Sequence, residues 1–133
     1  MQFRLAINGS NSQVVAREQL LAIISTIQGK RFTELHMSAE KGNSLSLLSN
    51  GDTAWLMYLR FQGDTGYRSY NSAHAGPADV KTVFVLSNGQ RDEYPLSWCI
   101  PVREACKALE EFFETGSRPA SISWQDDSSR HGT

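Results

Sequence analysis

The segment from Pro101 to Trp124 constrains the fold more than any other part of the sequence, because a helix, a turn and a strand follow one another there almost without slack. Gly116 supplies a residue that tolerates positive φ, and Arg118-Pro119 prevents the chain from re-entering a helix. Ile122–Trp124 then alternates apolar and polar residues as a short half-buried strand does. The helix itself is indicated by apolar residues at intervals of three and four, which share one face: Val102, Ala105, Cys106, Leu109, Phe112 and Phe113.

Length and charge limit the classes of function. A chain of 133 residues is large enough for one domain with its own core. Thirteen basic and 14 acidic residues give a net charge of −1, whereas a protein that binds nucleic acid usually carries a clear cationic excess. No segment approaches the roughly 20 apolar residues that span a bilayer, and the first residues do not resemble a secretory signal. We therefore expect a cytoplasmic protein with no nucleic-acid partner and no membrane partner.

Most of the remaining chain is predicted as short strands joined by tight turns. Apolar residues recur at helical spacing over residues 16–28 and predict a helix there. Asn50-Gly51 and residues 87–90 are strong hairpin signals. We expect an α+β fold, with a single domain over residues 1–125 and a polar, disordered tail over residues 126–133. The predicted domain is a curved, mainly antiparallel sheet of five to seven strands, with two helices packed on one face and the other face partly open. The expected strands are residues 3–7, 32–38, 44–48, 53–61, 67–70, 82–86, 92–96 and 122–124.

Large aromatic residues are assigned to the core, and the two cysteines are expected to be reduced. The core residues are Trp55, Phe112, Phe113 and Trp124. Cys99 and Cys106 are seven residues apart, which along a helix is about 10 Å and beyond the reach of a disulfide.

Candidate catalytic and metal-binding groups are sparse. His36, His74 and His131 are far apart in sequence, and neither a CxxC nor an HExxH motif occurs, so no metal and no cofactor is expected. A nucleophilic Cys99 paired with His74 remains an alternative, because such a histidine can be distant in sequence, although no local signature supports it.

Tyrosines and carboxylates near the turns suit a surface that binds a protein. Tyrosine adds contact area at a low entropy cost, and acidic groups steer a basic partner. The candidate contacts are Asp64, Tyr67, Tyr70, Asp92, Glu93 and Tyr94, with Tyr58 and Asp79 in the same set of strands and loops.

Residues 53–124 resemble the first-catalogued family of immunity proteins, which bacteria pair with polymorphic toxins. The similarity lies in the strand TAWLMYLRF, the segment GYRSYNS with the small-residue loop AHAGP after it, a hairpin ending in YPL, and the closing ISWQ. Its most specific part is FF-x-T-G-x-R-P-x-x-I-x-W, residues 112–124. Family members commonly carry an acidic residue directly after that tryptophan, whereas here Gln125 comes before Asp126.

The resemblance implies a function that composition alone does not. Proteins of this family are non-enzymatic antidotes in the cytoplasm that bind the toxic domain of a cognate toxin and block its active site. Some relatives accompany nucleic-acid deaminase toxins, whose catalytic zinc belongs to the toxin. A small cysteine-dependent enzyme and a generic protein-interaction module without a toxin partner, such as a scaffold that dimerises through an open sheet edge, are the alternatives.

Overall fold

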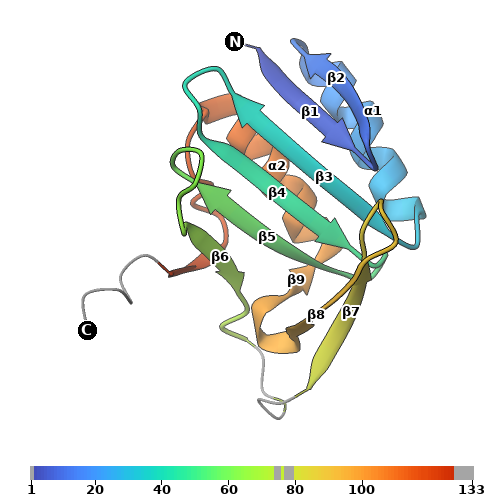
Figure 1. Cartoon of the computed structure of the whole chain (residues 1–133). Coiled ribbons are helices and arrows are strands. Elements are labelled where there is room, and N and C mark those ends of the chain that lie inside the picture. The colour runs from blue at the N-terminus through green and yellow to red at the C-terminus, as the bar shows by residue number, and fades with distance from the viewer. Residues whose placement is uncertain (1, 74–75, 77–79, 128–133) are drawn as a thin grey trace.

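The computed structural model describes residues 2–73, 76 and 80–127 and shows two helices against one large sheet (Figure 1). The helices are α1 (Arg17–Gly29) and α2 (Val102–Thr115), and a short 3-10 helix η1 covers Leu96–Trp98. The strands are β1 (Phe3–Ile7), β2 (Ser10–Val14), β3 (Thr33–Ala39), β4 (Ser44–Ser49), β5 (Thr53–Leu59), β6 (Tyr67–Tyr70), β7 (Lys81–Val85), β8 (Arg91–Pro95), β9 (Ile100–Pro101) and β10 (Ser123–Asp126).

The described strands of the main sheet pair antiparallel in the order β10-β6-β5-β4-β3-β1-β2, and β9 pairs with β5 as the eighth strand. β7 and β8 form a separate two-stranded hairpin. The α+β fold with two helices and an antiparallel sheet is therefore confirmed. The strand count exceeds the expected five to seven because β2 is polar (SNSQV) and shows no apolar alternation, and because β9 has only two residues.

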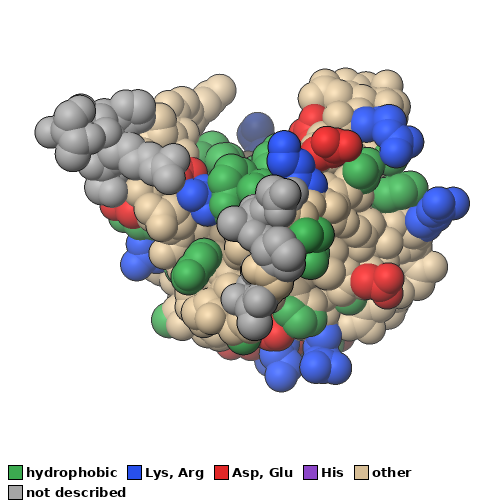
Figure 2. All heavy atoms as spheres, turned by 90° about the horizontal axis from the view of Figure 1, so that it is seen from below, with side chains coloured by type: hydrophobic (Ala, Val, Ile, Leu, Met, Phe, Trp, Pro, Cys, Tyr) green, Lys and Arg blue, Asp and Glu red, His purple; other side chains and the backbone are tan. Residues whose placement is uncertain are grey.

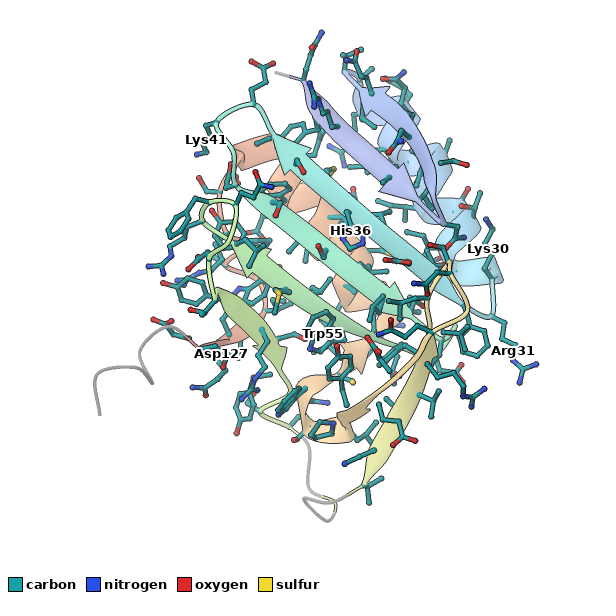
Figure 3. All side chains as sticks on the ribbon, in the orientation of Figure 1. Lys30, Arg31, His36, Lys41, Trp55 and Asp127 are labelled. Atoms are coloured by element: carbon teal, nitrogen blue, oxygen red, sulfur yellow. The ribbon has the colours of Figure 1, made fainter. Side chains whose placement is uncertain are left out.

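The two faces of the main sheet are covered differently. In Figure 1, α1 and α2 lie behind the sheet and the β7–β8 hairpin crosses in front of its lower end. Seen from below, the surface is hollowed along its upper side, which is the face that Figure 1 turns toward the viewer (Figure 2). His36 and Trp55 lie on this front face, His36 on the open part and Trp55 beside the hairpin (Figure 3). The hairpin thus covers only part of this face.

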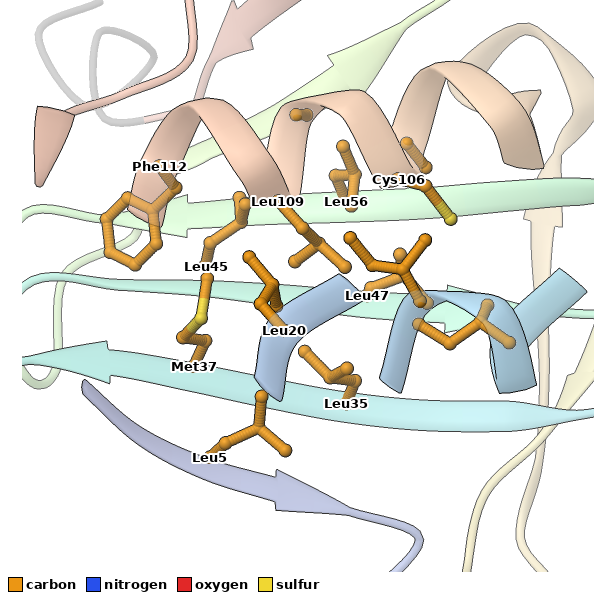
Figure 4. Packing of buried hydrophobic residues seen from close by; sticks show 14 of the residues in the cluster. Leu5, Leu20, Leu35, Met37, Leu45, Leu47, Leu56, Cys106, Leu109 and Phe112 are labelled. Atoms are coloured by element: carbon orange, nitrogen blue, oxygen red, sulfur yellow. The ribbon is translucent and has the colours of Figure 1, made fainter. Parts of the chain in front are cut away.

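The larger core lies between the sheet and the helices (Figure 4). Phe112 of α2 is fully buried, and its ring lies 5.3 Å from the ring of Phe3 in β1, in an edge-on arrangement. Trp55 is also buried, but on the other face of the sheet. The core assignment is confirmed for Phe112 and Trp55, whereas Phe113 and Trp124 are partly buried side chains packed against the same core.

Two glycines occupy backbone positions that other residues adopt with difficulty. Gly116 ends α2 with a φ of 67°, and its N–H donates to the carbonyl of Phe112, as expected from the sequence. Gly66 has a φ of 74° at the β5–β6 turn, and a Cβ there would lie 2.6 Å from the Tyr58 carbonyl oxygen. The absence of a side chain at Gly66 lets β6 begin close against β5.

Polar contacts fasten the C-terminal segment to the domain. The Glu111 carboxylate accepts hydrogen bonds from the backbone N–H groups of Ala120 and Ser121. Trp124 Nε1 donates to the Pro119 carbonyl at 2.7 Å, which orders the turn before β10. β10 then pairs with β6 and continues through Asp126. The expected tail stays a prediction for residues 128–133, which, with His131, lie outside the described residues.

Candidate partner-binding surface

A polar groove crosses β1, β2 and β3 on the part of the sheet that the hairpin leaves open. Opposite residues of paired strands point to the same side, and the register places Arg4 between Gln13 and Ser38, and Ala6 between Asn11 and His36. These six residues, with Leu5 and Ser12, line a hollow of about 630 Å³, and we call it the polar groove. A second hollow of about 500 Å³ shares Arg4, Gln13 and Ser38 and extends it toward Glu40 and Gln62.

The charge of the polar groove comes from Arg4. Its side chain is exposed, and none of the hydrogen bonds or ion pairs found among the described residues involves its guanidinium. Arg17, by contrast, bridges Glu110 and Glu114 at 3.0 and 2.9 Å, and Arg60 binds Asp64. The described residues that line the polar groove include one guanidinium and one imidazole but no carboxylate.

His36 links the polar groove to the tip of the hairpin. Its Nδ1 lies 2.7 Å from Ser46 Oγ, and its Nε2 lies 2.9 Å from Glu34 Oε2. The other oxygen of Glu34 accepts hydrogen bonds from the backbone N–H and the hydroxyl of Ser87, both at 2.8 Å. Burial raises the pKa of Glu34, but the hydrogen bonds from His36 and Ser87 outweigh it and lower the pKa overall. Glu34 therefore holds the hairpin against the sheet as a carboxylate.

The Ser46–His36–Glu34 chain has the residue types of a catalytic triad, but its setting favours a structural role. A nucleophilic serine needs nearby N–H donors that can stabilise an oxyanion. Ser46 lies in the middle of β4, which is paired on both sides with β3 and β5. Pairing on both sides engages the backbone N–H groups of β4, so this strand offers Ser46 no free N–H group for an oxyanion site.

Aromatic residues fill the space beneath the hairpin. The rings of Trp55 and Tyr94 stack with their centroids 4.6 Å apart and 1° between their planes. Trp98 lies 5.8 Å from Tyr94, and the Arg68 guanidinium lies 3.8 Å above the Trp98 ring. This part of the face is a second small core, closed by the buried Phe84 of β7.

Three of the six candidate contacts lie on β8, where they differ in exposure. Tyr94 faces the sheet, and its hydroxyl donates to Asp92 at 3.3 Å. Burial, followed by the charge of Asp92, raises the pKa of Tyr94. Asp92 also accepts a hydrogen bond from Gln90 Nε2 at 2.8 Å. Of the three, only Glu93 is exposed, so Asp92 and Tyr94 mainly stabilise the hairpin itself.

The other three candidates are divided between the two ends of β6. Arg60 donates to both oxygens of Asp64 at 2.9 and 2.8 Å and holds the pKa of that carboxyl well below its usual range. Two guanidiniums lie over the Tyr67 ring, that of Arg60 at 5.5 Å and that of Arg118 at 4.2 Å from its centroid. Tyr70, at the far end of β6, is 44% exposed. The structure thus brings Asp64 near Tyr67 but does not gather the six candidates at one place, and Asp79 lies outside the described residues.

The environment of Cys99 does not favour a nucleophile. Both cysteines are free, as expected, and the structure buries both of them. Burial raises the pKa of the Cys99 thiol to about 12, whereas a reactive cysteine needs a lowered pKa. His74, the base considered for it, lies outside the described residues. Among the residues that the structure describes, no three His, Cys, Asp or Glu side chains are placed to hold a metal ion. Neither α1 nor α2 has the length and apolar character of a membrane-spanning helix.

Sequence reasoning missed the polar groove because it missed β2. The signal was present at Asn8-Gly9, where both residues have positive φ, 49° and 87°, as a two-residue hairpin turn requires. Continuing the strand pattern past this turn would have paired Arg4 with Gln13 and placed both on the outer face.

Most of this fold matches the sequence model of a known protein family. The family model of immunity protein Imm1 matches residues 13–126, from β2 to the end of β10, and the chain belongs to this family. The predicted resemblance is therefore confirmed, and the match begins 40 residues earlier than the segment on which it was recognised. Membership implies an immunity role and a cognate toxin protein as the partner. No curated protein matches the chain significantly.

Proposed function

We propose that this protein is an antitoxin that binds the toxic domain of a cognate bacterial polymorphic toxin in a one-to-one complex. The observation that carries the proposal is the family match over residues 13–126. Inhibition is steric in this proposal, because the antitoxin covers the surface through which the substrate enters. A complex of this kind buries about 800 Å² or more on each partner.

The structure supports binding better than catalysis. Its front sheet face is only partly covered, and the exposed part is regular sheet, in which β1 pairs along its whole length with β2 on one side and β3 on the other. A surface of paired strands loses little conformational entropy when it binds. The two arrangements that resemble catalytic groups, Cys99 and the Ser46–His36–Glu34 chain, lack a reactive thiol and an oxyanion site, respectively.

We further propose that the toxin is a nucleic-acid deaminase and that the antitoxin acts in the cytoplasm. The support is the association of related immunity proteins with deaminase toxins. A deaminase toxin brings its own catalytic zinc, so the antitoxin needs neither metal nor cofactor. In this proposal the exposed candidates Tyr70 and Glu93 are available as contacts, whereas Asp64, Asp92 and Tyr94 would first have to leave their internal partners.

Co-expression with the toxic domain encoded by the neighbouring gene tests the proposal. We expect growth to be rescued, the two proteins to co-purify, and deaminase-type base substitutions in the host genome to fall to background. An unrelated toxic domain serves as the control and should not be neutralised. Failure of both rescue and co-purification would reject the antitoxin function. If the antitoxin rescues growth but cells that express the toxin alone show no base substitutions, only the deaminase assignment would be rejected.

A further inference from the structure

We propose that the polar groove is the surface that receives the toxic domain, and that its ligand is an acidic segment of the toxin with one carboxylate bound to Arg4. This inference rests on the proposed function and adds the place and the chemistry of the contact. The groove is the part of the front sheet face over β1, β2 and β3 that the helices do not cover and that the hairpin borders only at Glu34, where its tip contacts β3.

The first argument is charge complementarity. Among the described residues Arg4 has no ion-pair partner, the polar groove is lined by no carboxylate, and Glu40 lies in the adjoining hollow that Arg4 also lines. An arginine binds a carboxylate with two parallel hydrogen bonds, which fixes orientation as well as adding energy. The polar groove can therefore bind an anionic group of another molecule through Arg4.

The second argument is the set of neutral groups around Arg4. Gln13 and Ser38 lie directly across from it on the two neighbouring strands, and Asn11 and His36 flank Ala6 one row further along the groove. Amides, hydroxyls and an imidazole can both donate to and accept from a polar segment. The short side chain of Ala6 leaves the floor low, so that a loop can approach the sheet. The lining thus fits a polar loop better than an apolar helix.

Other occupants fit the polar groove less well. A nucleic acid would need several phosphate contacts, and the lining offers only one permanent cation. A second copy of this chain placed groove to groove would bring two arginines that lack ion-pair partners close together, which like-charge repulsion disfavours. A protein surface with an exposed aspartate or glutamate satisfies the charge and the hydrogen-bonding groups at once.

The test compares two charge reversals by their effect on the affinity for the toxic domain of the neighbouring gene, purified in an inactivated form. Arg4→Glu should weaken binding by about 100-fold, because it places a like charge opposite the toxin carboxylate. Arg4→Lys should bind more tightly than Arg4→Glu but less tightly than the wild type, because lysine keeps the charge and loses the two-bond geometry. Arg103→Glu is the matched control on the exposed side of α2, and it should change the affinity by less than about threefold.

Each outcome decides a definite point. Thermal unfolding checks that the variants remain folded, which we expect because Arg4 is exposed. Equal affinities of Arg4→Glu and Arg103→Glu would overturn the groove assignment while leaving the antitoxin function intact. Absence of binding by the wild-type chain would overturn both. A toxin variant with one surface Asp or Glu changed to Arg that restores binding to Arg4→Glu would identify the proposed carboxylate.

Discussion

The two faces of the main sheet carry different kinds of side chain. The face under α1 and α2 is mostly apolar, with residues such as Leu35, Leu47 and Leu56 fully buried. The opposite face has an aromatic part under the β7–β8 hairpin and a polar part over β1–β3. Alternation along each strand keeps the two sets apart, so the polar part can vary with little effect on the core. If the polar groove binds the toxin as proposed, stability and recognition are encoded by neighbouring residues that point in opposite directions.

The largest effect on stability is expected at the helix-covered face. Phe112→Ala should lower the free energy of unfolding by about 3–5 kcal/mol, because it leaves a cavity beside Phe3. Phe61→Ala is the matched control, since that ring is 56% exposed and its loss should cost less than about 0.5 kcal/mol. Chemical denaturation measures both. An unchanged midpoint for Phe112→Ala would contradict the core assignment.

A smaller loss is expected under the hairpin. Tyr94→Ala should cost about 2 kcal/mol, because it removes a half-buried ring that stacks on Trp55. Tyr94→Phe keeps the stack and removes only the hydroxyl contact with Asp92, so its unfolding free energy should stay near the wild-type value. If Tyr94→Ala instead weakened toxin binding without lowering stability, Tyr94 would be a contact as the sequence suggested and not a support of the hairpin.

A pH-dependent effect is expected where the hairpin meets the polar groove. The folded protein lowers the pKa of Glu34, so the carboxylate stabilises the fold above its unfolded pKa of about 4.3, and this stabilisation is lost as the pH falls through the lower folded pKa. Glu34→Gln should therefore be less stable than the wild type at pH 7, by about 1 kcal/mol, with a difference that shrinks in acid. Glu93→Gln, an exposed change on the same hairpin, is the control, and its difference in unfolding free energy from the wild type should not vary with pH. Denaturation curves between pH 3 and pH 7, roughly the range in which carboxylates titrate, measure both variants. A difference for Glu34→Gln that is constant with pH would contradict the assignment.

The smallest effect on stability is expected in the polar groove itself. Arg4→Ala should change the free energy of unfolding by less than about 0.5 kcal/mol, because no described residue forms an ion pair with Arg4. A loss above about 1.5 kcal/mol in the same denaturation assay, which is typical of a buried interaction, would show that Arg4 supports the fold and would remove the contrast between the two faces.

Sequence patterns predicted the elements whose side chains alternate or recur clearly. β5 shows this well, since Ala54 and Leu56 face the helices while Trp55 faces the hairpin, as its alternation indicated. The helix ending at Gly116 followed from its apolar stripe and its glycine. β2 was missed because a polar edge strand buries little and leaves no hydrophobic period.

The candidate contacts were harder to predict because they depend on tertiary pairing. The sequence predicts Asp64 to be an exposed acid, but Arg60, four residues earlier, donates hydrogen bonds to both of its carboxylate oxygens. In sequence Arg4 is an ordinary strand residue. Only the pairing of β1 with β2 and β3 shows that it lies in a hollow among neutral side chains. The family resemblance identified the class of protein but carried no contact residue with it.

The most direct test of the account is a titration of the toxic domain's activity with the purified chain, at a toxin concentration well above the dissociation constant. Binding that blocks the active surface predicts a linear fall in activity that reaches zero at one molar equivalent. Full toxin activity in the presence of excess chain, or inactivation by a small fraction of an equivalent that continues with time, would contradict inhibition by occupancy.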